Sequence, residues 1–208
     1  MSAAPNSYIP SMTNDGTGGY IIDKSRLPDG YPTQGHTAEF WEKLGRAVGT
    51  FGRLEEVLFR AIFALTGTIR PECDEQAIKK AVADWQAGIE KAGKEQLFAL
   101  IQRFDEAIQA HPESRFSASS RQELIEMLQK ARKHRNTVCH ASWLPSDADG
   151  FAKPFRNNYP DTVPEAVDCD YFDQLQRHVA ELECEVRDAV THMGYQVPGL
   201  GGPGRPVI

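Results

Sequence analysis

Between residues 37 and 193, apolar side chains recur at intervals of three and four residues, the period of amphipathic α-helices. Five such stretches follow one another, and no segment alternates convincingly with period two apart from a short candidate hairpin at 150–156. The pattern therefore predicts an all-α fold, a five-helix bundle of up-and-down type. The positions that follow this period, all apolar except Arg135, are in chain order Phe40, Leu44, Val48, Phe51, Leu54, Leu58, Ile62 and Leu65; Ile78, Val82, Trp85 and Ile89; Leu97, Ile101, Phe104 and Ile108; Leu124, Leu128, Ala131, Arg135 and Val138; and Leu175, Val179, Leu182, Val186 and Met193.

Capping residues give bounds to these helices. Thr37 is a suitable N-cap for a first helix that stops at Gly67, and Asp74 opens the second. His111-Pro112 ends the third helix, and Asp168 or Asp170 caps the fifth.

Outside the helical stretches the composition changes. Residues 1–36 are rich in Gly, Pro, Asn and Ser and show no period, which predicts an extended or disordered arm. Residues 194–208 have the glycines and prolines of a flexible tail. We therefore expect one helical domain over residues 37–193, flanked by these two segments.

Charge and cysteine content narrow the class of protein. The 208 residues carry a formal net charge of −6, so any contact with a polyanion is expected to be local rather than a broad basic coat. The N-terminus lacks the pattern of a signal peptide, and the uncharged run 61–69 is too short to span a bilayer. We expect a cytoplasmic protein without membrane segments. The four cysteines form no Cys-x-x-Cys pair and the histidines share no ligand spacing, so neither a metal nor a cofactor is expected.

One segment departs from this acidic background. Between Glu126 and Asp147 there is no carboxylate, and the cations Lys130, Arg132, Lys133 and Arg135 fall in that interval. His134 lies inside the basic run, where a surface position is expected, and His140 closes it. A fixed cation next to an imidazole is able to hold a phosphate and to move a proton beside it.

Helical geometry places three of these polar residues on one side of the fourth helix. At about 100° per residue, taking Arg135 as the origin, Asn136 lies near 100° and His140 near 140°. Arg135 also falls on the apolar stripe, where a lone arginine is costly unless it is paired or faces a polar cleft. One interpretation is structural: Arg135 pairs with a carboxylate from the first or fifth helix, and His140 closes the helix end. The other is a phosphate site. Cys139 is interpreted as a small packed side chain rather than a nucleophile.

The first helix carries a stripe of small residues. Gly45, Gly49 and Gly52 share one face, and each costs about 1 kcal/mol relative to alanine in a helix interior. Such a stripe is favourable where another backbone approaches closely, so we expect these glycines, with Arg53, to form a dimer interface. The arginines at positions 46, 53 and 60 beside it have two interpretations: a solvated face with intrahelical partners, or one wall of a cleft for an anion.

The segment Arg135-Asn136-Thr137-Val138-Cys139-His140 resembles the Arg-x4-6-His signature of the HEPN superfamily, including the polar residue directly after the arginine. The context is similar too: a long first helix containing Gly52-Arg53-Leu54-Glu55, the motif at the end of the fourth helix, a turn containing Trp143 and a final helix. The resemblance covers roughly residues 37–193.

The resemblance implies a homodimer in which two motif-bearing helices meet in one composite cleft. Many members of the superfamily are metal-independent endoribonucleases of toxin–antitoxin or phage-defence systems. Carried over, Arg135 and His140 are the catalytic pair, Asn136 supports them, RNA is the substrate, and an antitoxin or other regulatory protein is a further partner. Lys130, Arg132 and Lys133 are expected to hold flanking phosphates.

Two alternatives stay open at this point. Trp143 is either a base-stacking residue or a core tryptophan. Some relatives keep the helices and serve only to bind a nucleotide, RNA or a protein, so a non-catalytic binding module is the alternative function. The chain also departs from one branch of the superfamily, which has a modifiable tyrosine shortly after the histidine; here Ala141-Ser142-Trp143-Leu144 follows.

Overall fold

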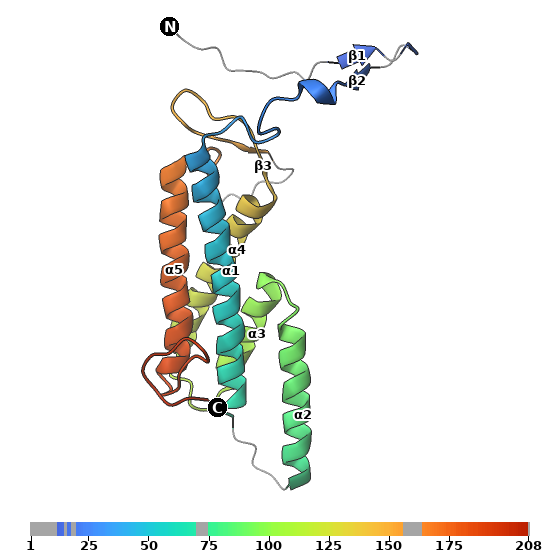
Figure 1. Ribbon diagram of the computed structural model, residues 1–208. Helices are drawn as coiled ribbons and strands as arrows, with labels where there is room; N and C mark the ends of the chain where they lie inside the picture. Colours follow the sequence, from blue (N-terminus) through green and yellow to red (C-terminus); the bar gives the residue numbers. More distant parts are fainter. Residues whose placement is uncertain (1–11, 15, 18–19, 70–74, 156–163, 208) are drawn as a thin grey trace.

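The computed structural model describes residues 12–14, 16–17, 20–69, 75–155 and 164–207. Its five helices and two small pairs of strands confirm the all-α fold class (Figure 1). Asp74, the expected cap of the second helix, lies outside these residues. The elements in chain order are β1 (Met12–Asn14), β2 (Tyr20–Ile22), a short 3-10 helix (Lys24–Arg26), α1 (Ala38–Gly67), α2 (Glu75–Ala92), α3 (Leu97–Ala110), α4 (Ala118–His140), β3 (Ser142–Trp143), β4 (Pro154–Phe155) and α5 (Cys169–Thr191).

Helix α1 is the central element of the bundle. The Thr37 hydroxyl accepts a hydrogen bond from the Phe40 amide at 3.2 Å, so the predicted N-cap is confirmed. The helix packs against α3, α4 and α5, and its apolar stripe is almost entirely buried. Burying each large apolar side chain contributes about 1.5–3 kcal/mol. The buried residues of α1 are Phe40, Leu44, Ala47, Phe51, Leu54, Val57, Leu58, Ala61, Ile62, Ala64 and Leu65.

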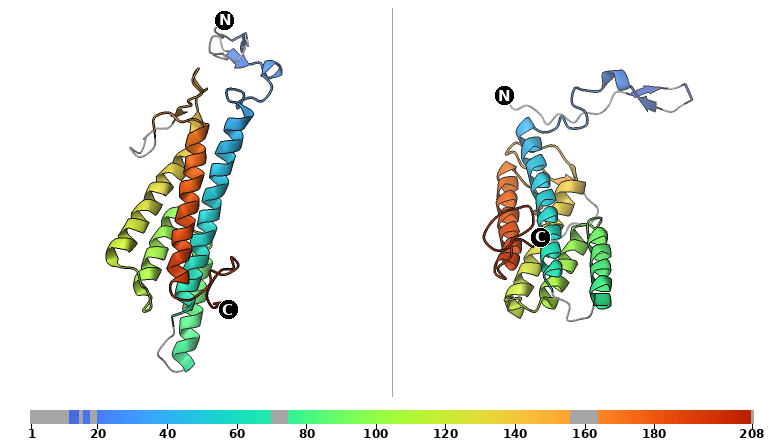
Figure 2. Two further views of the ribbon diagram at one scale, coloured as in Figure 1. Left: turned by 90° about the vertical axis from the view of Figure 1, so that its left-hand side faces the viewer. Right: turned by 60° about the horizontal axis from the view of Figure 1, so that its bottom comes forward.

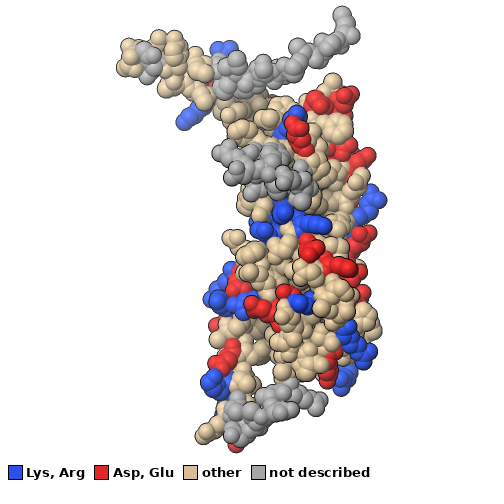
Figure 3. All heavy atoms as spheres, turned by 180° about the vertical axis from the view of Figure 1, so that it is seen from behind, with Lys and Arg blue, Asp and Glu red and all other residues tan. Residues whose placement is uncertain are grey.

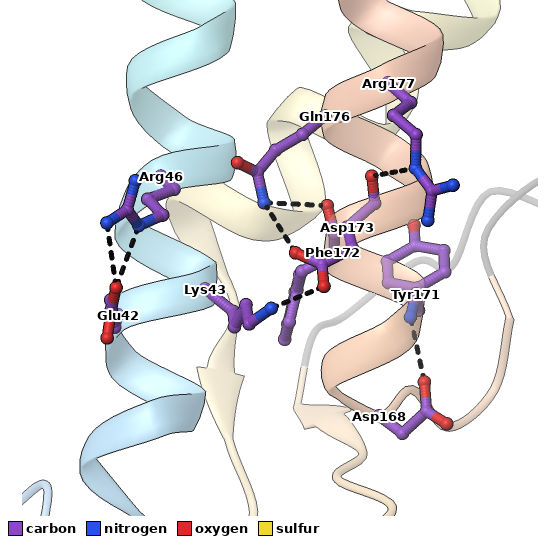
Figure 4. A network of polar contacts seen from close by, with 9 residues as sticks. All are labelled: Glu42, Lys43, Arg46, Asp168, Tyr171, Phe172, Asp173, Gln176 and Arg177. Carbon is purple, nitrogen blue, oxygen red and sulfur yellow. Dashed lines mark hydrogen bonds and ion pairs between the residues drawn. The ribbon is translucent and has the colours of Figure 1, made fainter.

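Helix α5 runs alongside α1 over most of its length (Figures 1 and 2). Of the two proposed caps, Asp168 is the N-cap: its carboxylate accepts from the Tyr171 amide at 2.9 Å. Lys43 of α1 pairs with Asp173 of α5 in the polar network above the core (Figure 4). The ion pair adds to the packing of the buried apolar faces of the two helices, which holds them side by side.

Helix α2 is helical as predicted, but its apolar stripe is only partly covered. Ile78 and Val82 are 41% and 46% exposed. Trp85 is the main anchor, because its indole N–H donates to the Thr66 hydroxyl at 3.0 Å and its ring lies 4.9 Å from that of Phe63. Packing of α2 is therefore concentrated in its C-terminal half, where Trp85 and Ile89 are half-buried and Ala92 is buried.

Helix α4 leads into a short antiparallel strand pair. Ser142 pairs with Phe155 and Trp143 with Pro154, so the expected hairpin around residues 150–156 is wider than the sequence indicated. The turn at its centre uses Gly150 at a φ of 87°. Ala152 exchanges two backbone hydrogen bonds with Val167, which lies just before the start of α5.

The N-terminal segment projects away from the bundle (Figures 1 and 2). Strands β1 and β2 pair in antiparallel register, with Met12 opposite Ile22. The segment joins the bundle through His36, which contacts the Ser146 hydroxyl at 3.1 Å and the Trp143 carbonyl at 3.2 Å.

The C-terminal residues, expected to form a flexible tail, turn back onto the bundle (Figure 2). The Arg205 amide donates to the Gly194 carbonyl at 2.8 Å, and Val197 is 1% exposed. Arg60 of α1 donates to the Pro198 carbonyl at 2.8 Å. Burial of one apolar side chain and bonds to backbone groups order a segment that composition alone describes as mobile.

Candidate functional site at the end of α4

The candidate motif occupies the last turns of α4. Ser117 caps the start of this helix by accepting from the Ser120 amide at 3.1 Å, and the Ala141 amide closes its end on the Thr137 carbonyl at 2.9 Å. Cationic side chains are stabilised at a helix C-terminus by the partial negative charge of its free carbonyls. The position of the motif therefore suits its charge.

Arg135 lies between a carboxylate and an imidazole. Its Nη2 is 3.5 Å from Oε1 of Glu55 on α1, and its Nη1 is 3.3 Å from Nε2 of His140. The Arg135 and Glu55 side chains are 24% and 29% exposed. The carboxylate partner from the first helix corresponds to the structural interpretation, whereas the contact with His140 assembles the two motif residues at one point.

The Arg135–Glu55 pair is an electrostatic contact without a well-formed hydrogen bond. Although Glu55 Oε1 is within 3.5 Å of the guanidinium, it is buried and has no hydrogen-bond partner among the described residues. A buried carboxylate oxygen without a donor is costly, because desolvation is not repaid by an aligned N–H. The sequence predicts a carboxylate partner from the first or fifth helix for Arg135, but it does not single out Glu55, because no local pattern links positions 55 and 135.

His140 is exposed, and its Nε2 faces Arg135. The Arg135 N–H is always a donor, so Nε2 accepts and the neutral ring carries its proton on Nδ1, an assignment made from the partner. Nε2 becomes a proton acceptor only when the Arg135 N–H turns from it to another partner, such as a phosphate. His140 thus points neither into the core nor toward a structural partner in another helix.

Asn136 is half-buried and does not join the Arg135–His140 contact. Its side chain makes no hydrogen bond with either residue in the part of the chain that the structure describes. It lies at i−4 from His140, so the two share a face of α4. The structure therefore places Asn136 next to the pair, without a bond to it.

The three flanking cations do not form one row. Arg132 donates from Nε to the Gln129 side chain of the same helix at 2.9 Å, and its guanidinium lies 5.0 Å from the centre of the Phe98 ring of α3. Lys130 is exposed, and Lys133 is half-buried two turns before His140 on nearly the same face. Lys133 is thus the cation best placed beside His140.

Charge on one whole face of the molecule is mixed. Seen from behind, acidic and basic side chains alternate along the bundle, and the coloured residues form no broad basic sheet there (Figure 3). This face therefore offers no broad basic area for contact with a polyanion.

Trp143 is packed against the core. Its ring meets those of Phe40 and Phe172 edge to face at 5.6 Å each, and its indole nitrogen is buried without a hydrogen-bond partner among the described residues. This packing corresponds to the core interpretation. One edge of the residue, together with Trp41, lines a pocket of about 310 Å³ beside the end of α4.

Cys139 is half-buried beside the same charges. Burial raises the pKa of its thiol, and the nearby Arg135 offsets this in part. A raised thiol pKa disfavours the thiolate at neutral pH, as expected for a packing residue.

His134 is not at the surface as expected from the basic run. It is half-buried, and its Nδ1 lies 2.7 Å from the hydroxyl of Tyr171 on α5. Burial lowers the pKa of His134 and raises that of Tyr171. The prediction was wrong because the basic run around His134 does not show which face of α4 is covered by α5.

The glycine stripe of α1 is exposed. A Cβ added at Gly45, Gly49 or Gly52 meets no atom within 4 Å among the described residues. Arg53 beside the stripe is paired with Glu56 at 3.0 Å and with Glu183 of α5 at 3.4 Å. The arginines of this helix thus have the carboxylate partners of a solvated face, while the glycines leave room for a close approach.

No family model, curated protein or solved structure matches this chain. Within the described residues, no helix is long and apolar enough to cross a membrane. No cluster of three His, Cys, Asp or Glu side chains suited to a metal ion occurs in that part of the chain.

Proposed function

We propose that this protein is a metal-independent endoribonuclease whose active centre contains Arg135 and His140 at a homodimer interface. The observation that carries the proposal is the 3.3 Å contact between the Arg135 guanidinium and Nε2 of an exposed His140. A permanent cation can stabilise charge on a reacting phosphate, and a solvent-accessible imidazole beside it can move a proton during attack by a ribose 2′-hydroxyl. The Arg-x4-His resemblance supports the same function.

In the proposed reaction, His140 takes the proton of a ribose 2′-hydroxyl as its oxygen attacks the adjacent phosphorus. The bond from phosphorus to the 5′-oxygen of the next nucleotide breaks, and a second imidazole or water protonates that oxygen. Arg135 stabilises the negative charge on the phosphorane oxygens. The products are a 2′,3′-cyclic phosphate and a 5′-hydroxyl, and DNA resists cleavage because it lacks the nucleophile.

A second copy would complete this centre. The glycine face of α1 is open, and Gly52 lies one turn before Glu55, which contacts Arg135. The face thus borders the candidate site. Small residues allow two helices to approach closely, so pairing of two such faces would bring the two Arg135–His140 pairs toward one cleft.

A non-catalytic module for binding RNA or a nucleotide is the second candidate function. The Arg135–His140 contact favours it, because Nε2, the acceptor nitrogen of a neutral ring, is already engaged by the guanidinium and is not free to take a proton. The two candidates share the phosphate contact and differ in whether a bond is broken.

The test is incubation of the purified protein with a structured RNA in EDTA, with Arg135→Ala and His140→Ala in parallel. Arg115→Ala and His192→Ala are matched controls, since both are exposed side chains beside the start of α4, at the other end of that helix from the motif. We expect cleavage by the wild type and the controls and a loss of at least about 100-fold in the two motif variants. RNA binding without cleavage by the wild type would favour the binding module instead.

A further inference from the structure

Glu55 differs from the other carboxylates of α1 in how it holds its arginine. The pairs Arg60–Glu56, Arg46–Glu42 and Arg53–Glu56 have nitrogen–oxygen distances of 2.7, 2.9 and 3.0 Å. The Arg135–Glu55 distance is 3.5 Å, and the Glu55 oxygen in this contact is buried without a hydrogen bond among the described residues. The pair is therefore attractive but incompletely formed.

Two surroundings make this pair sensitive to a third charge. Both side chains are less exposed than those of the Arg46–Glu42 pair, which are 66% and 59% exposed, so water screens their interaction less. Arg135 also extends toward the exposed His140. An anion arriving beside His140 therefore meets the guanidinium at Nη1, next to the Nη2 that faces Glu55.

We propose that Glu55 is a positioning residue that holds Arg135 in the free protein and competes with an RNA phosphate for it. This inference rests on the proposed function, in which Nη1 of Arg135, the nitrogen that faces His140, takes the phosphate while Nη2 keeps its contact with Glu55. Glu55 opposes phosphate binding, as a negative charge close to the site. It also restrains the guanidinium in the orientation from which Arg135 reaches the reacting phosphate.

The two effects have opposite signs, which separates this role from a purely structural one. Removing the charge of Glu55 should tighten RNA binding and slow the bond-breaking step at saturation. Loss of a structural ion pair would instead lower stability and reduce both quantities together.

The experiment compares wild type with Glu55→Gln, Arg135→Ala and the double variant. Glu56→Gln is the control, since its carboxylate is adjacent in sequence but pairs with Arg53 and Arg60. Binding is measured by fluorescence anisotropy with an RNA oligonucleotide whose riboses are 2′-fluoro-substituted, which lacks the nucleophile. Cleavage of the unmodified oligonucleotide is followed at saturating protein. Glu55→Ser is a second variant, and circular dichroism checks folding in each case.

We expect Glu55→Gln and Glu55→Ser to bind the 2′-fluoro RNA about three- to tenfold tighter, the effect of one partly screened charge. The gain should disappear when Arg135 is also alanine. The cleavage rate at saturation should fall about tenfold or more from lost orientation, and Glu56→Gln should change neither quantity.

Failure of this inference is distinct from failure of the proposed function. If the wild type cleaves with dependence on Arg135, and the Glu55 variants match Glu56→Gln in affinity and rate, the role of Glu55 is wrong and the ribonuclease proposal stands. If the wild type binds the 2′-fluoro RNA but does not cleave, the ribonuclease proposal is wrong. The affinities of the Glu55 variants for that RNA then still show whether Glu55 opposes phosphate binding. If the wild type neither binds nor cleaves, both proposals are overturned.

Discussion

His134 and His140 lie six residues apart on α4, yet their surroundings are opposite. His134 is half-buried and bonded to the Tyr171 hydroxyl of α5, whereas His140 is exposed and contacts Arg135. The first imidazole links two helices, and the second has a permanent cation beside it and access to solvent. On one helix, the face occupied by a histidine decides whether its imidazole contributes to stability or is available for chemistry.

The largest expected effect comes from replacing each of these two histidines by alanine. His140→Ala should lower RNA cleavage by about 10²–10⁴-fold and leave the melting temperature almost unchanged, because the side chain is exposed. His134→Ala should lower the free energy of unfolding by about 1–3 kcal/mol. Its rate of RNA cleavage, divided by the concentration of folded protein, should equal that of the wild type. Cleavage assays and thermal unfolding of both variants check this. Equal loss of activity in both would remove the distinction.

The exposure of His140 holds for a single chain, and the next prediction asks whether a second copy covers its surroundings. Leucines at Gly49 and Gly52 should weaken the proposed dimer by about 1–3 kcal/mol, since they fill the space that close helix approach needs. Sedimentation velocity over a range of concentrations measures the shift. Gly88→Leu on α2 is the control, because that glycine is also in a helix and open. An unchanged sedimentation coefficient would show that the glycine face of α1 is not the dimer interface.

Stability should fall as the pH is lowered from neutral. Burial lowers the pKa of His134 and of His111, so both are held neutral in the folded chain. The unfolded chain binds more protons below its ordinary histidine pKa of about 6.5, so this stability is present above that pH and is lost as pH falls toward the folded pKa.

Urea unfolding between pH 7.5 and 5.5 measures this dependence. His134→Gln should make the slope of the unfolding free energy against pH shallower, since one of the two buried imidazoles is then gone. Tyr171→Phe should cost about 1 kcal/mol at neutral pH through the lost hydrogen bond. A slope that is identical in wild type and His134→Gln would contradict the assigned role of His134.

Local patterns predicted the helices well. The three- and four-residue period, the cap Thr37 and the pair of candidate caps Asp168 and Asp170 predicted where α1 and α5 begin, because caps and periods depend on neighbours within one turn. The motif at the end of α4 was also visible, since Arg135 and His140 belong to one helix.

Contacts between distant segments were not predictable in the same way. Glu55 meets Arg135 across 80 positions of sequence, and His134 meets Tyr171 only because α4 and α5 pack together. The stripe of α2 has the helical period of a core helix, yet Val82 remains exposed. Whether an apolar or polar face finds a partner depends on how the helices assemble, which a single stretch of sequence does not encode.

The most direct test of the central claim is the chemistry of the RNA ends. Wild-type protein is incubated in EDTA with an RNA oligonucleotide, and the fragments are identified by mass spectrometry beside those from His140→Ala. The account predicts fragments with 2′,3′-cyclic phosphate and 5′-hydroxyl ends from the wild type, and intact RNA with the variant. Fragments with 5′-phosphate ends, or cleavage that persists without His140, would contradict it.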